Sequence, residues 1–209
     1  TNGKVIVVWG QNSSGSTPST DGLWVSQTTD GLAWSPAAPI TPDPSFGAVL
    51  AVARNGSAHV VYSKQGKTGG WPLFTAYYDG RAWKENTATL DENSNYTDSN
   101  PRLALNASGD GLLVFRRNWG IVATVLTGQT FTPPIAMDSD EDASVYEAAV
   151  AMNRKGQGLV VWSSPSSGSE ALLARTYTPA VGWSSPSPPI VTSETIGAIA
   201  AALDEQGMA

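Results

Sequence analysis

Short apolar segments alternate with polar turns along this chain, and one apolar phrase recurs through its whole length. A glycine opens the phrase, and an aromatic residue ends it six positions later, in residues 3–9 (GKVIVVW), 56–62 (GSAHVVY), 109–115 (GDGLLVF) and 156–162 (GQGLVVW). Gly207 begins a fifth copy, and successive glycines stand about 50 residues apart, which is the period of a repeat architecture. Short apolar runs bounded by turn formers predict buried β-strands.

We expect four short strands in each repeat, with the recurring phrase as the second strand. The first strands are rich in alanine, as in residues 48–54 (AVLAVAR) and 147–153 (EAAVAMN), which is expected where strands converge on a crowded axis. Asp-Gly pairs at residues 30–31 and 79–80 predict two-residue hairpin turns between third and fourth strands. The fourth strands open on large rings that would fill the outer gap between neighbouring sheets: Trp34, Trp83, Phe131 and Trp183.

Radial repetition of four-stranded antiparallel sheets is a β-propeller. The sequence therefore predicts an all-β fold with about four blades in one domain, residues 1–209, divided into units of about 1–45, 46–99, 100–145 and 146–195 with a closing strand at 196–209. Because the chain starts at a second strand and finishes with a first strand, we expect residues 197–204 to pair with residues 4–9 and close the ring. A fragment of a larger propeller and a homo-oligomer that completes a ring are open alternatives.

The composition of the chain mainly excludes certain partners and kinds of site. Twelve basic and eighteen acidic residues give a formal charge of −6, which opposes binding to nucleic acids and to anionic membranes. The chain has no cysteine, so disulfides, thiolate metal sites and a cysteine nucleophile are excluded. No apolar run approaches the roughly 18 to 20 residues of a membrane-spanning helix, so membrane insertion is not expected. Abundant Ser, Thr, Asn, Gly and Trp with few charges favour an extracellular or bacterial surface location.

Two turn segments, residues 28–34 (TTDGLAW) and 79–83 (DGRAW), resemble the Asp-box of sialidase-like propellers, which reads Ser-x-Asp-x-Gly-x-x-Trp. The Gly-to-Trp spacing of three is kept, whereas the Asp stands one residue closer to the Gly, and the third and fourth units lack it. The resemblance implies a propeller in which this Asp is structural. Residues 78–83 (YDGRAW) show a weaker similarity to fucose-binding lectins, which assemble rings from chains of few repeats.

The same resemblance sets out what a sialidase would need: three arginines that converge on a carboxylate, a nucleophilic tyrosine with a glutamate partner, and an acid aspartate. No arginine stands in the Phe/Tyr-Arg-Ile-Pro context that it requires, and His59, the only histidine, is isolated in an alternating strand. The sequence therefore predicts no catalytic residues and favours a non-enzymatic binding or scaffold module. The alternatives are a fragment of a sialidase-like glycoside hydrolase and a purely architectural repeat unit without a ligand.

Candidate ligand-binding residues lie on the long connections. Turns of a blade alternate between two faces, and the second-to-third and fourth-to-first connections are the long ones, where binding residues are usually found. Two tryptophans on these connections, Trp71 and Trp119, lie outside the predicted strands. Such rings either stack on sugars or cap the core. We expect a glycan or a protein surface as the partner, contacted by Trp71, Trp119, Arg116, Arg117, Tyr96 and Asp98.

An acidic run at residues 138–142 (DSDED) places carboxylates at alternate positions, a spacing that Ca²⁺ can use. The run departs from the calcium-loop pattern, because Ala143 stands where a glycine belongs. It predicts either a solvated acidic loop or a Ca²⁺ site formed by Asp138, Asp140 and Asp142, and no other cofactor is expected.

Overall fold

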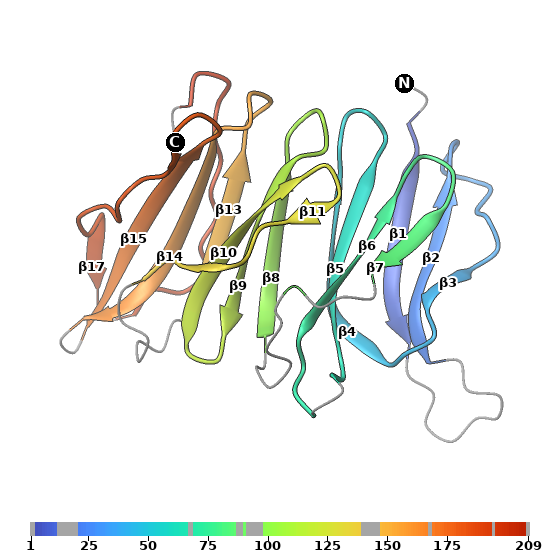
Figure 1. Cartoon of the computed structure of the whole chain (residues 1–209), viewed down its shortest axis with the longest axis horizontal. Helices are drawn as coiled ribbons and strands as arrows, with labels where there is room; N and C mark the ends of the chain where they lie inside the picture. Colours follow the sequence, from blue (N-terminus) through green and yellow to red (C-terminus); the bar gives the residue numbers. More distant parts are fainter. Residues whose placement is uncertain are drawn as a thin grey trace.

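The computed structural model describes residues 3–11, 21–66, 69–86, 90, 98–138, 147–166, 169–193 and 195–207. Every regular element within them is a β-strand, and the strands form four antiparallel sheets. Figure 1 shows these sheets side by side in chain order, from the first at the right to the fourth at the left. None of the described residues forms a helix with the length and apolarity of a membrane span. The predicted all-β propeller architecture is confirmed.

Each sheet is one blade, and its strands pair in chain order. Blade 1 contains β1 (Val5–Gln11), β2 (Gly22–Thr28) and β3 (Ala38–Thr41). Blade 2 contains β4 (Ser45–Val52), β5 (Ala58–Lys64), β6 (Leu73–Tyr78) and β7 (Trp83–Asn86). Blade 3 contains β8 (Asp98–Leu105), β9 (Gly111–Arg117), β10 (Gly120–Thr127), β11 (Thr130–Phe131) and β12 (Ile135–Ala136). Blade 4 contains β13 (Ala148–Met152), β14 (Gly158–Ser166), β15 (Ser169–Thr178), β16 (Gly182–Trp183) and β17 (Val191–Ser193).

The recurring phrase forms β1, β5, β9 and β14, the second strands of the predicted blades. Its glycine ends the turn from the first strand with a left-handed backbone, at φ values of 86°, 96° and 81° for Gly56, Gly109 and Gly156. Gly207 has a φ of 87° in the fifth copy. Residues with a side chain rarely adopt this region, so the repeated glycine is required by the turn.

The apolar core lies between blades, and alternate positions of the recurring strand face opposite neighbours. Val60 and Tyr62, four and six residues after the glycine, pack with Leu23 of blade 1. Val61, one position between them, packs with Leu113 of blade 3. The same pattern repeats farther along the chain, where Val160 and Trp162 of blade 4 pack against Val114 of blade 3. Each blade is therefore stabilised by the blade on either side of it.

Within the described chain, no blade covers the corresponding face of blade 1. Val7 occupies the same repeat position as Val60, yet it is 44% exposed whereas Val60 is 0% exposed. Trp34, which we expected to fill an outer gap, is exposed on this blade as well. The other three predicted gap-filling rings do pack against the cores between blades: Trp83, Phe131 and Trp183.

The predicted closure of the ring is wrong. In the described chain β1 pairs only with β2, and the two chain ends lie at opposite ends of the row of blades (Figure 1). Residues 197–204 pack on blade 4 instead, where Ile199 and Leu203 join the core formed by Leu159 and Val161. Ile199 and Leu203 are half-buried on this face of blade 4, and β1 lies at the far end of the row.

Hydrogen bonds between successive turns give the last segment the place of a first strand. Asn153 Nδ2 donates to the carbonyl of Asp204 at 3.0 Å. Between blades 2 and 3, Asn55 Nδ2 donates to the carbonyl of Ser108 at 2.7 Å. Each of these two contacts joins a turn to the equivalent turn of the next repeat. Residues 197–207 therefore lie beside blade 4 in the way that β8, a first strand, lies beside blade 2.

The Asp-Gly turns are longer than the two residues that we predicted. β6 and β7 pair from Tyr78 and Trp83 outward, which leaves residues 79–82 in the loop. The carboxylate oxygen Oδ1 organises each loop by accepting two backbone N–H groups, those of Leu32 and Ala33 for Asp30 and those of Arg81 and Ala82 for Asp79. These bonds favour the ionised form, lowering the pKa of Asp30 to about 2 and also lowering the pKa of Asp79.

Candidate functional site

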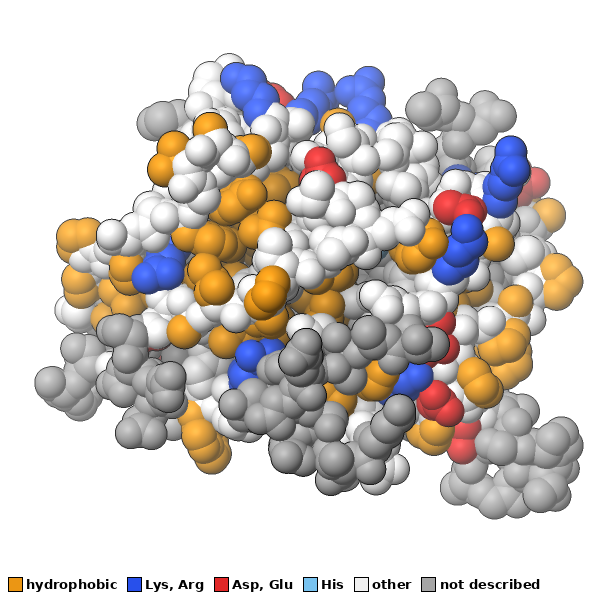
Figure 2. Space-filling model, viewed as in Figure 1, with side chains coloured by type: hydrophobic (Ala, Val, Ile, Leu, Met, Phe, Trp, Pro, Cys, Tyr) orange, Lys and Arg blue, Asp and Glu red, His pale blue; other side chains and the backbone are white. Residues whose placement is uncertain are grey.

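The antiparallel strands bring the long connections to one end of the molecule, which we call the long-loop end and which lies at the bottom of Figure 1. The recurring strand ends there with a polar residue eight positions after its glycine, and each of these residues has a polar side-chain partner: Gln11, Lys64, Arg117 and Ser164. Figure 2 shows acidic and basic side chains close together in the lower part of the same view. The short turns occupy the opposite end.

Two β-bulges at equivalent positions shape the long-loop end of blades 2 and 3. The register of β4 shifts between Phe46 and Val49, and that of β8 shifts between Ser99 and Arg102. The backbone is left-handed inside each bulge, with φ values of 63° at Gly47 and 52° at Asn100. A bulge redirects side chains and often lies beside an active site. Because β4 and β8 contact each other, the two bulges belong to neighbouring strands.

An aromatic pair lies at the bulge of β4. The rings of Phe46 and Trp71 have centroids 4.6 Å apart and planes tilted by 46°. Phe46 is exposed and Trp71 is half-buried. The backbone N–H of Asp98 donates to the carbonyl of Trp71 at 3.1 Å, so the connection that carries Trp71 is attached to the start of β8. The pair offers an apolar surface suited to stacking against a sugar ring.

Asp98 and Arg117 form a buried ion pair inside blade 3. They are cross-strand neighbours of β8 and β9, and Arg117 Nε lies 3.3 Å from Asp98 Oδ1. The guanidinium also lies over the ring of Phe115, with its carbon 5.3 Å from the centroid. Both side chains are thus held by their own blade, and they fix the ends of the two strands that carry Ser99 and Arg116.

Arg116 and Ser99 present polar atoms that the blade does not satisfy. The two residues are register partners of β9 and β8. Arg116 Nε and Ser99 Oγ are both buried, and neither has a hydrogen-bond partner among the described residues. Since buried polar atoms are normally bonded, these two atoms are available to a further hydrogen-bonding group. A guanidinium suits a carboxylate or sulfate, which it can bind through two parallel hydrogen bonds.

The structure places Trp71, Asp98, Arg116 and Arg117 at the long-loop end, and it joins Asp98 to Trp71 and to Arg117. Trp119 is 60% exposed and lies in the hairpin between β9 and β10, next to Asn118 with its φ of 52°. Tyr96 lies outside the described residues. Phe46 and Ser99 were not predicted, although their spacing of one repeat and the residues that follow them, Gly47 and Asn100, are visible in the sequence.

The acidic run is described only at Asp138, because Asp140 and Asp142 lie outside the described residues. Asp138 Oδ2 accepts hydrogen bonds from Ser164 Oγ at 2.7 Å and from Trp162 Nε1 at 3.2 Å. It therefore joins blade 3 to blade 4. Within the described ranges no three His, Cys, Asp or Glu side chains cluster to hold a metal ion. The Ca²⁺ site stays a prediction.

A tyrosine and a glutamate, the pair that the sialidase resemblance requires, do meet at this end. Tyr62 donates its hydroxyl to Glu85 Oε1 at 2.7 Å, yet Tyr62 is fully buried between blades 1 and 2. Burial, together with the hydrogen bond and charge of Glu85, raises the pKa of the Tyr62 phenol. A buried phenol that resists ionisation is unsuited to nucleophilic attack, so this pair is structural.

Lys64 completes the cluster around Glu85. Its Nζ lies 2.5 Å from Glu85 Oε1 and 2.9 Å from Asp43 Oδ2, and it also lies 4.3 Å from the ring centroid of Phe74. Burial opposes the charge of Lys64, but the hydrogen bonds to the two carboxylates outweigh it and raise the pKa of the ammonium. The cluster joins blade 1 to blade 2.

No protein-family model matches this chain, and no curated protein matches its sequence. Solved structures do match it. An ulvan lyase of polysaccharide lyase family PL25 superposes on 99% of the chain and 61% of its own length, with a TM-score of 0.59 and 15% identity. An α-L-arabinanase of Penicillium chrysogenum superposes on 85% of the chain and 60% of its own length, with a TM-score of 0.56 and 14% identity. The Hadza microbial sialidase Hz136 covers 86% of the chain at a TM-score of 0.51 and 17% identity, and the chain covers 41% of it.

Because the sequence identities are low, the comparisons establish the fold alone. They confirm the resemblance to sialidase-like propellers as a resemblance of fold. They also correct the functional interpretation. The three propellers named above are a polysaccharide lyase, an arabinanase and a sialidase, so the sequence-based prediction of a non-enzymatic binding or scaffold module is wrong. The alternative of a part of a glycan-cleaving enzyme fits them better. The chain spans about three fifths of the length of the ulvan lyase and of the arabinanase, at 61% and 60%.

Proposed function

We propose that this chain forms four blades of an extracellular glycan-cleaving propeller enzyme, a polysaccharide lyase or a glycoside hydrolase. Its long-loop end, across blades 2 to 4, binds an acidic sugar of the substrate. One observation carries the proposal: the bulged ends of β4 and β8 are neighbours at the long-loop end, where Phe46 of β4 pairs with the half-buried Trp71. Ser99 of β8 and its register partner Arg116 each bear a buried polar atom that lacks a partner among the described residues.

An acidic sugar fits this set of groups. The rings of Phe46 and Trp71 suit the apolar face of a pyranose, and the hydroxyl of Ser99 suits a sugar hydroxyl. Arg116 supplies a cation for a carboxylate or a sulfate. The ulvan lyase is also known in a structure bound to -[GlcA(1-4)Rha3S]-, with a TM-score of 0.60 to this chain. The net charge of −6 disfavours polyanions in general, so the local guanidinium has to provide the attraction.

We assign binding and positioning, rather than proton transfer, to the described residues. Glycoside hydrolysis generally uses two carboxyl groups that flank the scissile bond. The described carboxylates discussed above all have structural partners: Asp98 contacts Arg117, Asp43 and Glu85 contact Lys64, and Asp138 contacts Ser164. These contacts stabilise the blades. The catalytic acid and base would then come from elsewhere in the enzyme, and the described residues would position the sugar for them.

The test is calorimetric titration with oligosaccharides of ulvan and, for comparison, with neutral arabinobiose. We expect Arg116→Ala to weaken binding of the acidic oligosaccharide at least tenfold with little effect on arabinobiose, because only the former offers an anion. Trp71→Ala should weaken both. Arg154→Ala, an exposed substitution at the opposite end of the molecule, is the matched control and should change neither.

Cleavage is followed in parallel on a panel of acidic and neutral polysaccharides, by release of reducing ends and of unsaturated uronate. A folded protein that binds no acidic glycan, or whose Arg116→Ala variant binds the ulvan oligosaccharide as tightly as the wild type, would contradict the proposal.

A further inference from the structure

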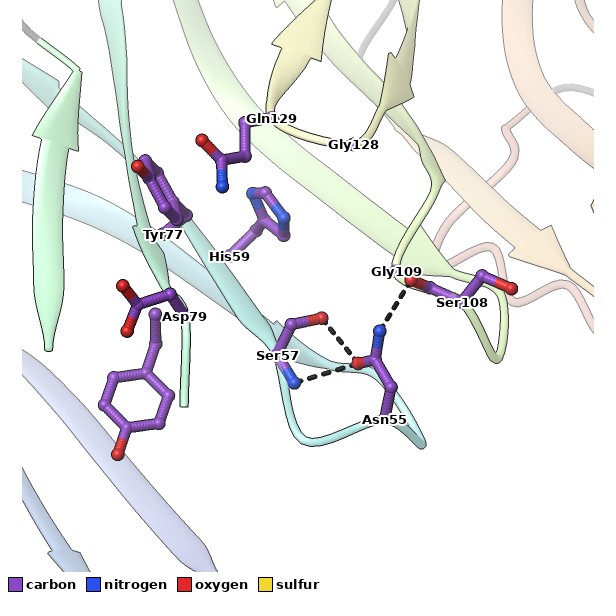
Figure 3. A pocket seen from close by; sticks show the side chains of 10 residues that line it. Asn55, Ser57, His59, Tyr77, Asp79, Ser108, Gly109, Gly128 and Gln129 are labelled. Carbon is purple, nitrogen blue, oxygen red and sulfur yellow. Dashed lines mark hydrogen bonds between the residues drawn. The ribbon is translucent and has the colours of Figure 1, made fainter. Parts of the chain in front are cut away.

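A hollow opens at the end with the short turns, opposite the proposed glycan site. It has a volume of about 160 Å³ and lies between blades 2 and 3. Blade 2 contributes Asn55, His59 and Tyr77, and blade 3 contributes Ser108 and Gln129 (Figure 3). The sequence singled out none of them as a ligand-binding residue, and His59 was predicted to be an isolated strand residue.

The floor of this hollow is held by hydrogen bonds between the two blades. Asn55 Nδ2 donates to the carbonyl of Ser108 at 2.7 Å, and Asn55 Oδ1 accepts from the N–H and the hydroxyl of Ser57 at 2.9 and 2.6 Å. Gly109 allows the close approach, since a Cβ there would lie 2.7 Å from Ser57 Oγ and its φ is 96°. The shape of the hollow is therefore fixed by the turns that form it.

His59 is the polar group that the fold leaves unused in this hollow. It is 4% exposed, and its ring nitrogens make no hydrogen bond within the described residues. Its ring stacks on Tyr77 with centroids 6.2 Å apart, and Figure 3 shows the Gln129 side chain near both rings. Burial lowers the pKa of His59, so the imidazole is neutral near pH 7 and offers one donor and one acceptor. Because the ring lines the hollow and neither nitrogen is bonded to a described residue, both nitrogens are available to a ligand.

The charges around the hollow disfavour ions. Asp79 is the one acidic or basic side chain among its described lining residues, apart from the neutral His59. Its Oδ1 accepts two backbone N–H groups, and its Oδ2 lies 2.9 Å from Lys84 Nζ. An anion would be repelled by this carboxylate, and a cation would find it already bonded. A volume of about 160 Å³ suits one small molecule.

We propose that this hollow binds one uncharged, hydroxyl-rich molecule of the monosaccharide or polyol class through His59, Tyr77 and Gln129. Sugar hydroxyls both donate and accept, as the neutral imidazole and the side-chain amide do. The stacked faces of His59 and Tyr77 add an apolar wall. The site is separate from the proposed glycan site and does not depend on it. A ligand with so few heavy atoms is expected to bind weakly, with a Kd of about 1 mM.

Because His59 is the only histidine, nuclear magnetic resonance gives its imidazole one set of signals in the spectrum of the whole chain. Xylose, glucose and glycerol are the uncharged probes, and glucuronate is the charged control. We expect a saturable shift of the His59 signals with xylose or glucose. Gln129→Ala and Tyr77→Phe should weaken the binding at least fivefold, whereas Arg116→Ala should leave it unchanged. Loss of glycan binding in Arg116→Ala with an intact His59 response separates the two sites.

Three outcomes would overturn the inference: no saturable shift with any uncharged probe, binding by Gln129→Ala and Tyr77→Phe as tight as that of the wild type, or equally tight binding of glucuronate. Gln129 is exposed in a turn, so its substitution tests the site even where Tyr77→Phe disturbs folding. Dispersed amide spectra of each variant verify that it is folded.

Discussion

Lys64 of blade 2 and Asp43 of blade 1 are joined by an ion pair of 2.9 Å across the boundary between the two blades. Glu85 shares the same ammonium and also accepts the hydroxyl of Tyr62. Lys64 and Glu85 are largely buried, while Asp43 is 58% exposed. The three charges therefore contribute unequally to the stability of the interface.

Replacing Lys64 should cost far more than replacing Asp43. Lys64→Met leaves the half-buried Glu85 without its cation, and we expect the free energy of unfolding to fall by about 2 kcal/mol. Asp43→Asn, the control, removes an exposed partner and should change it by less than about 0.5 kcal/mol. Urea denaturation measures both. Similar losses for the two variants would show that the burial of Glu85 does not matter.

Asp138 makes the corresponding connection between blades 3 and 4. Asp138→Ala leaves the Ser164 hydroxyl and the buried Trp162 indole N–H without their acceptor, so we expect a loss of roughly 2 to 3 kcal/mol. Asp138→Asn retains a carbonyl acceptor and should lose about half as much. Chemical denaturation followed by tryptophan fluorescence distinguishes the two variants. An equal loss in both would indicate that the negative charge, and not the hydrogen bonds, stabilises this boundary.

The open face of blade 1 is tested by a pair of equivalent valines. Val60→Ala creates a cavity between two blades and should cost about 2 kcal/mol, whereas Val7→Ala should cost less than about 0.5 kcal/mol because Val7 is 44% exposed. The free energies come from urea unfolding curves at several protein concentrations. A large loss for Val7→Ala would mean that this face is covered in solution, as in a ring completed by a second chain, and sedimentation would then detect the oligomer.

Stability should depend on pH through His59. Burial lowers its pKa in the folded protein below 6.5, so the unfolded chain binds the proton more readily as the pH falls. The stability present above pH 6.5 is therefore lost as the pH falls through the folded pKa. His59→Gln should flatten the curve of unfolding free energy below pH 6.5. An unchanged slope in that variant would assign the effect to other groups.

A second decline should follow in more acidic solution. The pKa of Asp30 is lowered to about 2 from an ordinary value of 3.8, so protonation of this carboxylate weakens its turn only as the pH falls through that interval. Asp30→Asn should remove this part of the acid transition. Circular dichroism at fixed temperature over the acidic range measures it, and an identical transition in the variant would contradict the assignment.

Much of the fold could be predicted because its cause is local. The recurring phrase alternates on a two-residue period, and its glycine satisfies a turn that needs a left-handed backbone, so β1, β5, β9 and β14 are visible in the chain. Connection lengths also place Trp71, Asp98, Arg116 and Arg117 at one end of the molecule. The ligand of these residues is not determined by local sequence, and the prediction that the chain is not an enzyme was wrong.

The sequence by itself determined the repeat, the phase of the strands and the end of the molecule where charged side chains gather. Only the tertiary structure decided which faces are covered. Val7 and Val60 occupy the same repeat position, and they differ in burial because a neighbouring blade packs on one and not on the other. The bulges that align Ser99 with Arg116, the packing of residues 197–204 on blade 4 and the unused imidazole of His59 likewise depend on contacts between sheets. A periodic pattern specifies which side of a strand is apolar, but not what lies against that side.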